Sequence, residues 1–294
     1  MGSVFESPAD VAQHLSSVGY LVDPATATTV FLAARLGRPL LIEGPAGVGK
    51  TELAKAVATS TDAELVRLQC YEGLDEARAL YEWNYKKQLL RIQATSPAET
   101  SGRTAWEQTH DDIFTEEFLL TRPLLTAIRR DEPTVLLIDE VDKTDVEVEA
   151  LLLEVLSEFQ VTIPELGTIT ATRRPFVVLT SNATRELSEA LKRRCLYLYL
   201  DYPSAERERD IVLSRVPEIE GDLAEQLVRT VATLRTLELK KSPSVAETID
   251  WARTLLALNA TELDEATTAA TLGVVLKHVT DHRRATAALK LPLP

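Results

Sequence analysis

One run of residues decides the fold of this chain: Leu40-Leu41-Ile42-Glu43-Gly44-Pro45-Ala46-Gly47-Val48-Gly49-Lys50-Thr51. Its first residues have the apolar character of a buried strand, and the residues after Thr51 continue with helical periodicity. A strand, a Gly-x-x-x-x-Gly-Lys-Thr loop and a helix in this order form the phosphate-binding P-loop signature. A chance glycine-rich turn would not need the strand before it and the helix after it. The predicted nucleotide-binding residues are Gly44, Pro45, Ala46, Gly47, Val48, Gly49, Lys50 and Thr51.

The residue types in this loop match the chemistry of a phosphate. Glycines lack a Cβ atom, so the backbone N–H groups can curve around an anion. The helix that follows directs the positive end of its dipole at the same place. We expect Lys50 to add a full charge near the β- and γ-phosphates of ATP, and Thr51 to offer its hydroxyl to Mg²⁺.

A second segment, Val135-Leu136-Leu137-Ile138-Asp139-Glu140, reads as a buried parallel strand that ends in two carboxylates. In open α/β sheets, ligands bind beyond the carboxyl ends of the strands, so these acids should face the phosphates. We expect Asp139 to help hold Mg²⁺, which prefers oxygen ligands, and Glu140 to orient and activate the attacking water. A strand capped by surface acids is the alternative, and the P-loop in the same chain makes it the weaker one.

Asn182 follows a third apolar strand, Phe176-Val177-Val178-Leu179-Thr180-Ser181. Its amide could bind the attacking water or the γ-phosphate. It could equally cap the helix that begins near Leu187. The residues alone leave both interpretations open.

The composition favours a soluble globular protein with a protein partner or a ring assembly. Of 294 residues, 45% are hydrophobic, and 45 acidic against 32 basic residues give a net charge of −13. That charge disfavours a general nucleic-acid binder and makes a protein partner or a ring assembly the better prediction. There is no apolar run of about 18 residues, no basic-then-apolar leader pattern, and two cysteines provide no disulfide framework, so we expect a cytoplasmic protein without a membrane segment.

Strand and helix patterns alternate up to Leu200, and only helical patterns follow Asp201-Tyr202-Pro203-Ser204. The fold class is therefore α/β, with a parallel sheet flanked by helices in residues 1–200 and an all-helical domain in residues 201–294. The expected helices include Leu74 to Arg91, Glu116 to Arg130, and Leu263 to Leu289, the last with a break at Gly273 as an alternative.

The order of these motifs resembles the AAA+ ATPases. The P-loop, the acidic strand end, Thr180-Ser181-Asn182 and then Arg193-Arg194-Cys195 follow one another as in that superfamily, and in detail the chain looks like its MoxR group. The run Cys70-Tyr71-Glu72-Gly73-Leu74-Asp75 is similar to the subgroup containing CoxD, an accessory protein for molybdenum-containing carbon monoxide dehydrogenase. The resemblance covers roughly residues 20 to 260.

The resemblance implies a helical lid after the AAA+ core and a ring, often a hexamer, with ATP and Mg²⁺ at subunit interfaces. It makes Asn182 the sensor 1 residue and Arg194 an arginine finger that reaches the neighbouring site, with Arg193 as the reserve candidate. A surface basic cluster at a helix C-terminus is the alternative for both arginines. It also implies a partner with a von Willebrand factor A domain and a client metalloenzyme that the chain remodels or matures.

Two other functions compete with this one. A nucleic-acid motor or loader of the same superfamily conflicts with the acidic composition. A small-molecule kinase on a P-loop fold has no use for a sensor asparagine, an interface arginine or a helical lid of this size.

One position departs from the family pattern. The family carries a sensor 2 arginine in a Ser-Pro-Arg setting, whereas this chain has Ser244 after Ser242-Pro243. Either Lys240 or Lys241 substitutes for the arginine, or the lid does not touch the γ-phosphate.

Three smaller features have two interpretations each. His278 and His282 have a spacing that can bind a metal, but no third ligand is evident and a solvated helix face is the plainer interpretation. The aromatic segment Tyr71 to Tyr85 is a substrate-facing insertion or a helix packed on the core. Cys70 is a reactive thiol or, by default, a small buried hydrophobe.

Overall fold

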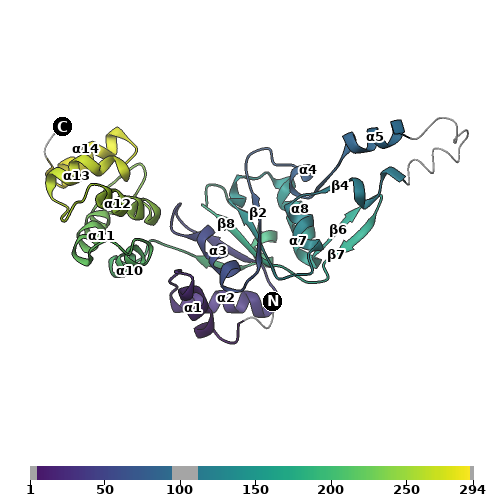
Figure 1. Cartoon of the computed structure of the whole chain (residues 1–294), viewed down its shortest axis with the longest axis horizontal. Coiled ribbons are helices and arrows are strands. Elements are labelled where there is room, and N and C mark those ends of the chain that lie inside the picture. Colours follow the sequence, from purple (N-terminus) through teal and green to yellow (C-terminus); the bar gives the residue numbers. More distant parts are fainter. Residues whose placement is uncertain (1–4, 95–111, 292–294) are drawn as a thin grey trace, which may run out of the picture.

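A five-stranded parallel sheet lies at the centre of the computed structural model, which describes residues 5–94 and 112–291 (Figure 1). The strands, in spatial order, are β2 (Glu64–Gln69), β5 (Thr134–Asp139), β8 (Phe176–Ser181), β1 (Leu40–Glu43) and β9 (Leu196–Tyr199). Glu43 is level with Ser181 on one side and with Tyr199 on the other, and Gln69 is level with Asp139. The carboxyl ends of all five strands therefore meet at one edge, as expected for a doubly covered α/β sheet.

Both faces of the sheet are covered because its strands carry apolar residues on both sides. Leu40, Ile42 and Leu137 pack with the first group of helices, whereas Leu41, Leu136 and Ile138 pack with the second. The first group is α1 (Pro8–Ser17), α2 (Pro24–Leu36) and α3 (Lys50–Ser60), and the second is α7 (Pro123–Arg129), α8 (Val146–Glu158) and α9 (Glu189–Arg194). The predicted α/β core of parallel strands flanked by helices is confirmed.

Two of the expected helices are interrupted by strands. The segment from Leu74 to Arg91 contains α4 (Glu76–Ala79), β3 (Tyr81–Trp83) and α5 (Tyr85–Ala94). The segment from Glu116 to Arg130 contains the 3₁₀ turn η1 (Glu116–Phe118), β4 (Leu119–Thr121) and α7. The two expectations were wrong at the same place because β3 pairs antiparallel with β4. A pairing between segments about 40 residues apart overrides local helical periodicity.

Trp83 explains why the aromatic segment leaves the helical pattern. Its ring is buried, meets Phe114 edge to face at 5.1 Å, and belongs to the core. Tyr81 packs partly against the same core, whereas Tyr71 and Tyr85 are exposed. The aromatic segment from Tyr71 to Tyr85 therefore contributes Trp83 to the core and leaves its two end tyrosines on the surface. Two further elements of this region are the turn η2 (Val141–Lys143) and a hairpin formed by β6 (Gln160–Ile163) and β7 (Gly167–Thr170).

In the described residues after β9, up to position 291, all regular elements are helices, and they gather at one end of the molecule (Figure 1). Their apolar residues form a cluster drawn only from positions 212 to 291, separate from the two clusters of the sheet. The expected helix from Leu263 to Leu289 is broken by η3 near Gly273. These elements are α10 (Ala205–Arg215), α11 (Gly221–Arg235), α12 (Val245–Ala257), α13 (Glu265–Thr271), η3 (Leu272–Val274) and α14 (Val279–Ala288).

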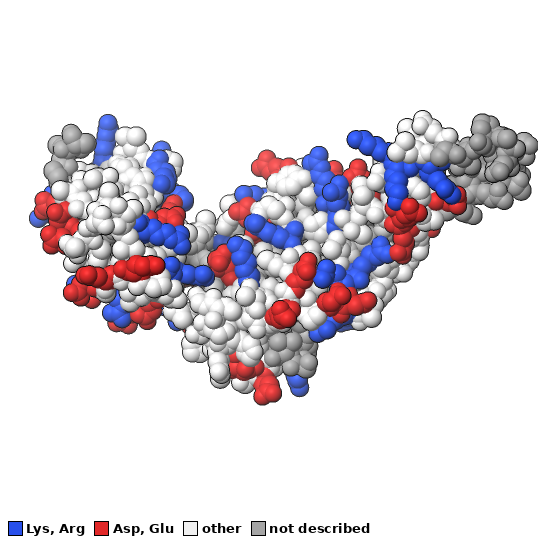
Figure 2. Space-filling view, viewed as in Figure 1, with Lys and Arg blue, Asp and Glu red and all other residues white. Residues whose placement is uncertain are grey.

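Figure 2 shows acidic and basic side chains interspersed over the sheet body and the helical region alike. Within the described ranges, none of the helices is both long enough and apolar enough to cross a bilayer.

A buried ion pair joins the helices of the C-terminal region. Glu208 of α10 is 0% exposed, and its carboxylate accepts two hydrogen bonds from the guanidinium of Arg235 and one from the hydroxyl of Thr248. The Nε of Arg235 donates to the carbonyl of Pro243, and its guanidinium lies over the ring of Tyr202 at 4.3 Å. One arginine therefore connects α10, α11, the segment before α12 and the segment before α10.

We expect Arg235→Leu to destabilise the helical region by about 3–5 kcal/mol, because the Glu208 carboxylate would remain buried without its cation. Urea unfolding followed by circular dichroism measures the loss. Arg229→Leu is the matched control, since Arg229 is 75% exposed in its pair with Glu225, and it should change stability by at most about 0.5 kcal/mol. Equal unfolding midpoints for the two variants would contradict the assignment.

Candidate nucleotide-binding site

The P-loop runs from β1 into α3 as the sequence predicts, and two of its glycines, Gly44 and Gly47, are required by close contacts. A Cβ on Gly44 would lie 1.9 Å from the carbonyl oxygen of Leu200. Gly47 has φ +75°, and a Cβ there would lie 2.5 Å from the side chain of Ser244. No other residue type fits both the space and, at Gly47, the left-handed backbone.

Lys50 is the first residue of α3, and its side chain is turned back over the loop. It is 6% exposed, and its ammonium donates to the carbonyls of Gly44 and Pro45 at 2.7 Å each and to Oδ1 of Asn182 at 2.8 Å. Burial lowers its pKa, against the opposing effect of the nearby acids Asp142, Asp139 and Glu140. A buried ammonium held only by neutral oxygens is suited to receive an anion.

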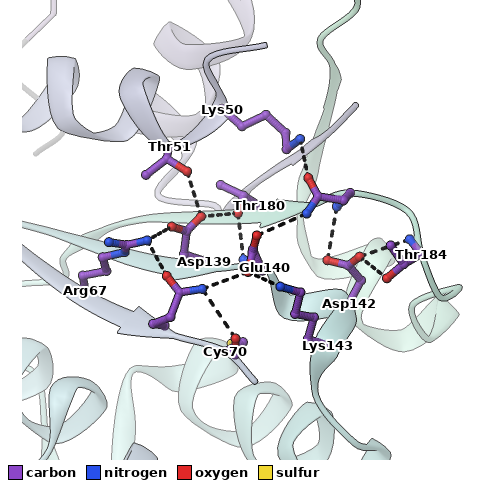
Figure 3. Close-up of polar contacts among 12 residues, drawn as sticks. Lys50, Thr51, Arg67, Cys70, Asp139, Glu140, Asp142, Lys143, Thr180 and Thr184 are labelled. Carbon is purple, nitrogen blue, oxygen red and sulfur yellow. Dashed lines mark hydrogen bonds and ion pairs between the residues drawn. The ribbon is translucent and has the colours of Figure 1, made fainter. Parts of the chain in front are cut away.

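Asp139 lies beside Thr51, as its place at the end of β5 predicts (Figure 3). It is 2% exposed, and its Oδ1 accepts from the hydroxyls of Thr51 at 2.9 Å and Thr180 at 2.5 Å. Its Oδ2 forms an ion pair with Arg67 of β2 at 2.5 Å. The hydroxyl of Thr51 and the carboxylate of Asp139 supply the hard oxygen ligands that Mg²⁺ prefers, so this pair fits the ion.

Glu140, which directly follows β5, adopts a left-handed conformation with φ +60° and ψ +47°. This conformation is uncommon for a residue with a side chain and often occurs at functional sites. The backbone N–H of Glu140 donates to the hydroxyl of Thr180 at 2.9 Å. Its carboxylate accepts from Lys143 at 2.6 Å, from Gln69 at 3.1 Å and from Asn182 at 3.4 Å (Figure 3).

Asn182 bridges the P-loop and the acidic strand end, since its amide accepts from Lys50 and donates to Glu140. The alternative role as a helix cap is wrong, because the side chain of Ser188 caps α9. Asp142 fixes the backbone here by accepting from the N–H groups of Asn182 and Thr184 and from the hydroxyl of Thr184. Burial alone would raise the pKa of Asp142, but these donors hold it below its ordinary value.

These groups open into a cavity of about 870 Å³ between the sheet and the helical region, large enough for a nucleotide. Figure 2 shows the surface hollowed between these two parts of the molecule. Apolar residues line one portion of the cavity, and arginines of the helical region line another. The apolar lining includes Leu21, Val22, Leu200, Ile211, Val245 and Ile249, and the arginines are Arg207, Arg215 and Arg253.

Neither lysine near Ser244 belongs to the cavity lining. Lys241 pairs with Glu247 at 2.8 Å, and the backbone N–H groups of Lys240 and Lys241 donate to the buried carboxylate of Asp281. Burial alone would raise the pKa of Asp281, but these N–H groups hold it below its ordinary value. Ser244 itself caps α12, so no charged side chain occupies the place where the family has an arginine.

Arg193 and Arg194 end α9 and are exposed, outside the cavity lining. The Nε of Arg194 donates to the hydroxyl of Ser157 at 2.7 Å. The guanidinium of Arg38 donates to the carbonyls of Arg193, Arg194 and Cys195, which satisfies the free carbonyls at the helix end. Within one chain the two arginines do not meet the P-loop, which is the arrangement that a finger acting on a neighbour requires.

Several residues of this site were missed from the sequence, among them Arg67, Gln69, Asp142, Lys143 and Thr180. Gln69 and Arg67 alternate on β2, and the register places Gln69 beside Asp139. Polar residues at the carboxyl end of a strand were the available indication, but only the strand order shows which strand lies beside β5.

The histidine pair does not gather a metal site. The Nε2 of His282 lies 2.8 Å from the carbonyl of Leu276, and His278 precedes α14 as its N-cap residue. Across residues 5–94 and 112–291, no three His, Cys, Asp or Glu side chains lie together as metal ligands would.

Comparison with known proteins gives a family match. The model described as "ATPase family associated with various cellular activities (AAA)" matches residues 40–200, which is more than half of the chain. The gas vesicle ATPase GvpN of Haloferax mediterranei is 28% identical over 215 residues, which covers 68% of this chain and 57% of GvpN. The chaperone protein ClpB 2 of Parasynechococcus marenigrum is 34% identical over 182 residues, which covers 58% of this chain and 17% of ClpB 2.

The chain thus spans little more than half of GvpN and a small part of ClpB 2. A solved structure of a RuvB mutant from Thermotoga maritima resembles the chain with a TM-score of 0.52 at 18% identity, covering 98% of this chain and 84% of that one. At this identity the likeness concerns the fold alone, and it includes the helical C-terminal region.

We expect both cysteines to be unreactive in the folded protein. Burial is the main cause that raises the pKa of Cys70 and of Cys195 to about 12, and the acids Asp139, Asp142 and Glu140 add to it at Cys70. At pH 8 the thiolate fraction is then about 10⁻⁴, too small for rapid disulfide exchange. Titration with a chromogenic disulfide reagent should detect no fast thiol in the native chain and two in urea. A fast native thiol would show that at least one of the two cysteines is reactive.

Proposed function

This chain belongs to the AAA ATPase family, and from that premise we propose that Mg²⁺-dependent ATP hydrolysis by this chain drives the remodelling or maturation of a partner metalloenzyme. The proposal follows the MoxR-like order of motifs, the CoxD-like run at Cys70 to Asp75 and, for the client, the molybdenum-containing carbon monoxide dehydrogenase type. Similarity to proteins named as chaperones supports a remodelling role.

One observation carries the ATPase part of this proposal. Lys50, Asp139 and Glu140, which lie up to 90 positions apart in the sequence, line one cavity, and Asn182 bridges Lys50 and Glu140. The apolar lining near Val22 provides a separate place for the nucleobase of ATP. A triphosphate with its base would therefore lie with the phosphates at the P-loop.

The side chains divide the work by their chemistry. Lys50 and the loop N–H groups would hold the phosphates, and Thr51 and Asp139 would hold Mg²⁺. When bound, the metal ion neutralises charge on the phosphate oxygens. Arg67 already pairs with Asp139, so it holds this carboxylate in place beside Thr51.

Glu140 would accept a proton from the attacking water, and Asn182 would orient that water or the γ-phosphate as sensor 1. Glu140 is engaged by Lys143 and Gln69, which must release it for the proton transfer. The left-handed backbone of Glu140 sets the direction in which its side chain leaves the end of β5.

The ring is part of the proposal. Arg194, or Arg193 in its place, would act as a finger in the neighbouring site, with the chains arranged as a hexamer. The hydrogen bonds from Arg38 to the carbonyls of Arg193 and Arg194 hold the backbone of both arginines in place at the end of α9. The proposal also includes a partner with a von Willebrand factor A domain and a cytoplasmic location. It divides the chain into a nucleotide-binding domain of residues 1–200 and a helical lid of residues 201–294. The acidic net charge of −13 and the mixed surface charges favour protein partners over nucleic acid.

We expect Glu140→Gln to bind ATP with unchanged affinity and to hydrolyse it at least about 10²-fold more slowly, because the proton acceptor is lost. Phosphate release and equilibrium binding of a fluorescent ATP analogue measure the two effects. Lys50→Ala is the control, and it should lose binding as well as hydrolysis. Normal turnover in Glu140→Gln would remove Glu140 from the mechanism.

We expect Arg194→Ala to bind ATP normally and to lose the hydrolysis that depends on assembly. Mixing it with Lys50→Ala chains should recover activity, because some interfaces then combine an intact P-loop with an intact finger. Phosphate release across a series of mixing ratios measures this recovery, with light scattering to confirm assembly. Mixed rings of unchanged size and no activity would speak against a finger acting between subunits.

A further inference from the structure

Ser244 is built into the start of α12 in a way that an arginine could not reproduce. It is 4% exposed, and its hydroxyl accepts from the backbone N–H of Glu247 at 3.3 Å. The carboxylate of Glu247 in turn accepts from the N–H of Ser244 at 2.8 Å, which completes a capping box. The first turn of α12 therefore has a fixed shape.

This first turn rests directly on the P-loop. The N–H of Ala246 donates to the carbonyl of Gly47 at 3.4 Å. A Cβ on Gly47 would lie 2.5 Å from both Cβ and Oγ of Ser244, a distance that real Cβ contacts do not reach. The contact joins the helical region to the loop through backbone and one small side chain.

The carbonyl of Gly47 and the N–H of Val48 belong to one planar trans peptide, so they point in opposite directions. In a P-loop the N–H groups turn toward the phosphates. When phosphate fixes the direction of the Val48 N–H, it also fixes the Gly47 carbonyl that accepts from α12. The same peptide thus serves the phosphates on one side and the helical region on the other.

We propose that Ser244 is a positioning residue through which the helical region responds to the shape of the P-loop, in place of an arginine that responds to the charge of the γ-phosphate. The proposal rests on the proposed nucleotide binding. Because the contact involves Gly47 and no charged side chain, ADP and ATP should order α12 to the same extent.

The test compares Gly47→Ala, Ser244→Gly and the double variant. Gly47→Ala should weaken ADP and ATP binding by the same factor, at least about tenfold, because the new Cβ meets Ser244 and its backbone is strained. Ser244→Gly should bind within about threefold of wild type, since glycine is an acceptable cap. The double variant should recover most of the loss, because the atoms that the new Cβ meets are gone. Calorimetry gives the affinities, and hydrogen exchange of the α12 amides shows the ordering.

Two further variants separate steric contact from other effects. Gly73 has a similar φ of +77°, and no atom lies within 4 Å of a Cβ added there. The stability that Gly73→Ala loses therefore measures backbone strain without a steric contact. Ser244→Leu leaves the P-loop sequence intact and enlarges the contact from the α12 side, so it should reduce affinity even if Gly47→Ala fails to fold.

Four results would overturn the inference: no recovery in the double variant, wild-type affinity in Ser244→Leu, a loss confined to ATP, or α12 exchange that does not change with nucleotide. A wild-type chain that binds neither nucleotide would overturn the proposed function together with the inference. If the wild-type chain binds and hydrolyses ATP but the double variant does not recover affinity, the inference is overturned and the proposed function stands.

Discussion

The structure depends on the P-loop, whose backbone is closely packed on two sides at positions that carry glycine. Gly44 passes against the carbonyl of Leu200, at the end of β9, and Gly47 passes against Ser244, at the start of α12. Both contacts are closer than any Cβ allows. The P-loop is therefore held by the sheet on one side and by the helical region on the other, and the cavity lies between these two supports.

Beyond the loop, the site brings charged groups close together, of which Lys50, Asp139 and Asp142 are buried and Glu140 is half-buried. Asp139, Glu140 and Asp142 lie close to Lys50, and each of these carboxylates accepts hydrogen bonds from several donors. A buried carboxylate without partners would be costly, so the surrounding donors are what permit three acids in this space. The arrangement favours ligands that bring negative phosphate oxygens to Lys50 and a cation to Asp139.

The helical region meets the rest of the chain through the backbone contact of α12 with the P-loop and through an ion pair between Arg215 and Glu52 at 3.7 Å, whereas its buried carboxylates find their partners within the region. Asp281 holds the backbone of Lys240 and Lys241, and Glu208 holds Arg235. These buried pairs fix the segment that leads to Ser244. The contact that the start of α12 makes with Gly47 involves the neutral side chain of Ser244 and the N–H of Ala246, and on our proposal the position of α12 therefore depends on the loop backbone.

The sequence by itself determined the P-loop, the acidic strand end, the covered parallel sheet and the change to helices after Leu200. These features rest on local chemistry: glycine spacing, hydrophobic periodicity and polar residues at strand ends. Only the tertiary structure decided that Gln69 and Lys143 hold Glu140, that β3 and β4 interrupt two helical patterns, and that Ser244 rests on Gly47. Each of these contacts but one, Lys143 with Glu140, joins residues far apart in the chain, and each depends on strand order, register or backbone direction. No single segment carries that information, because spatial neighbours are set by how the segments pack together.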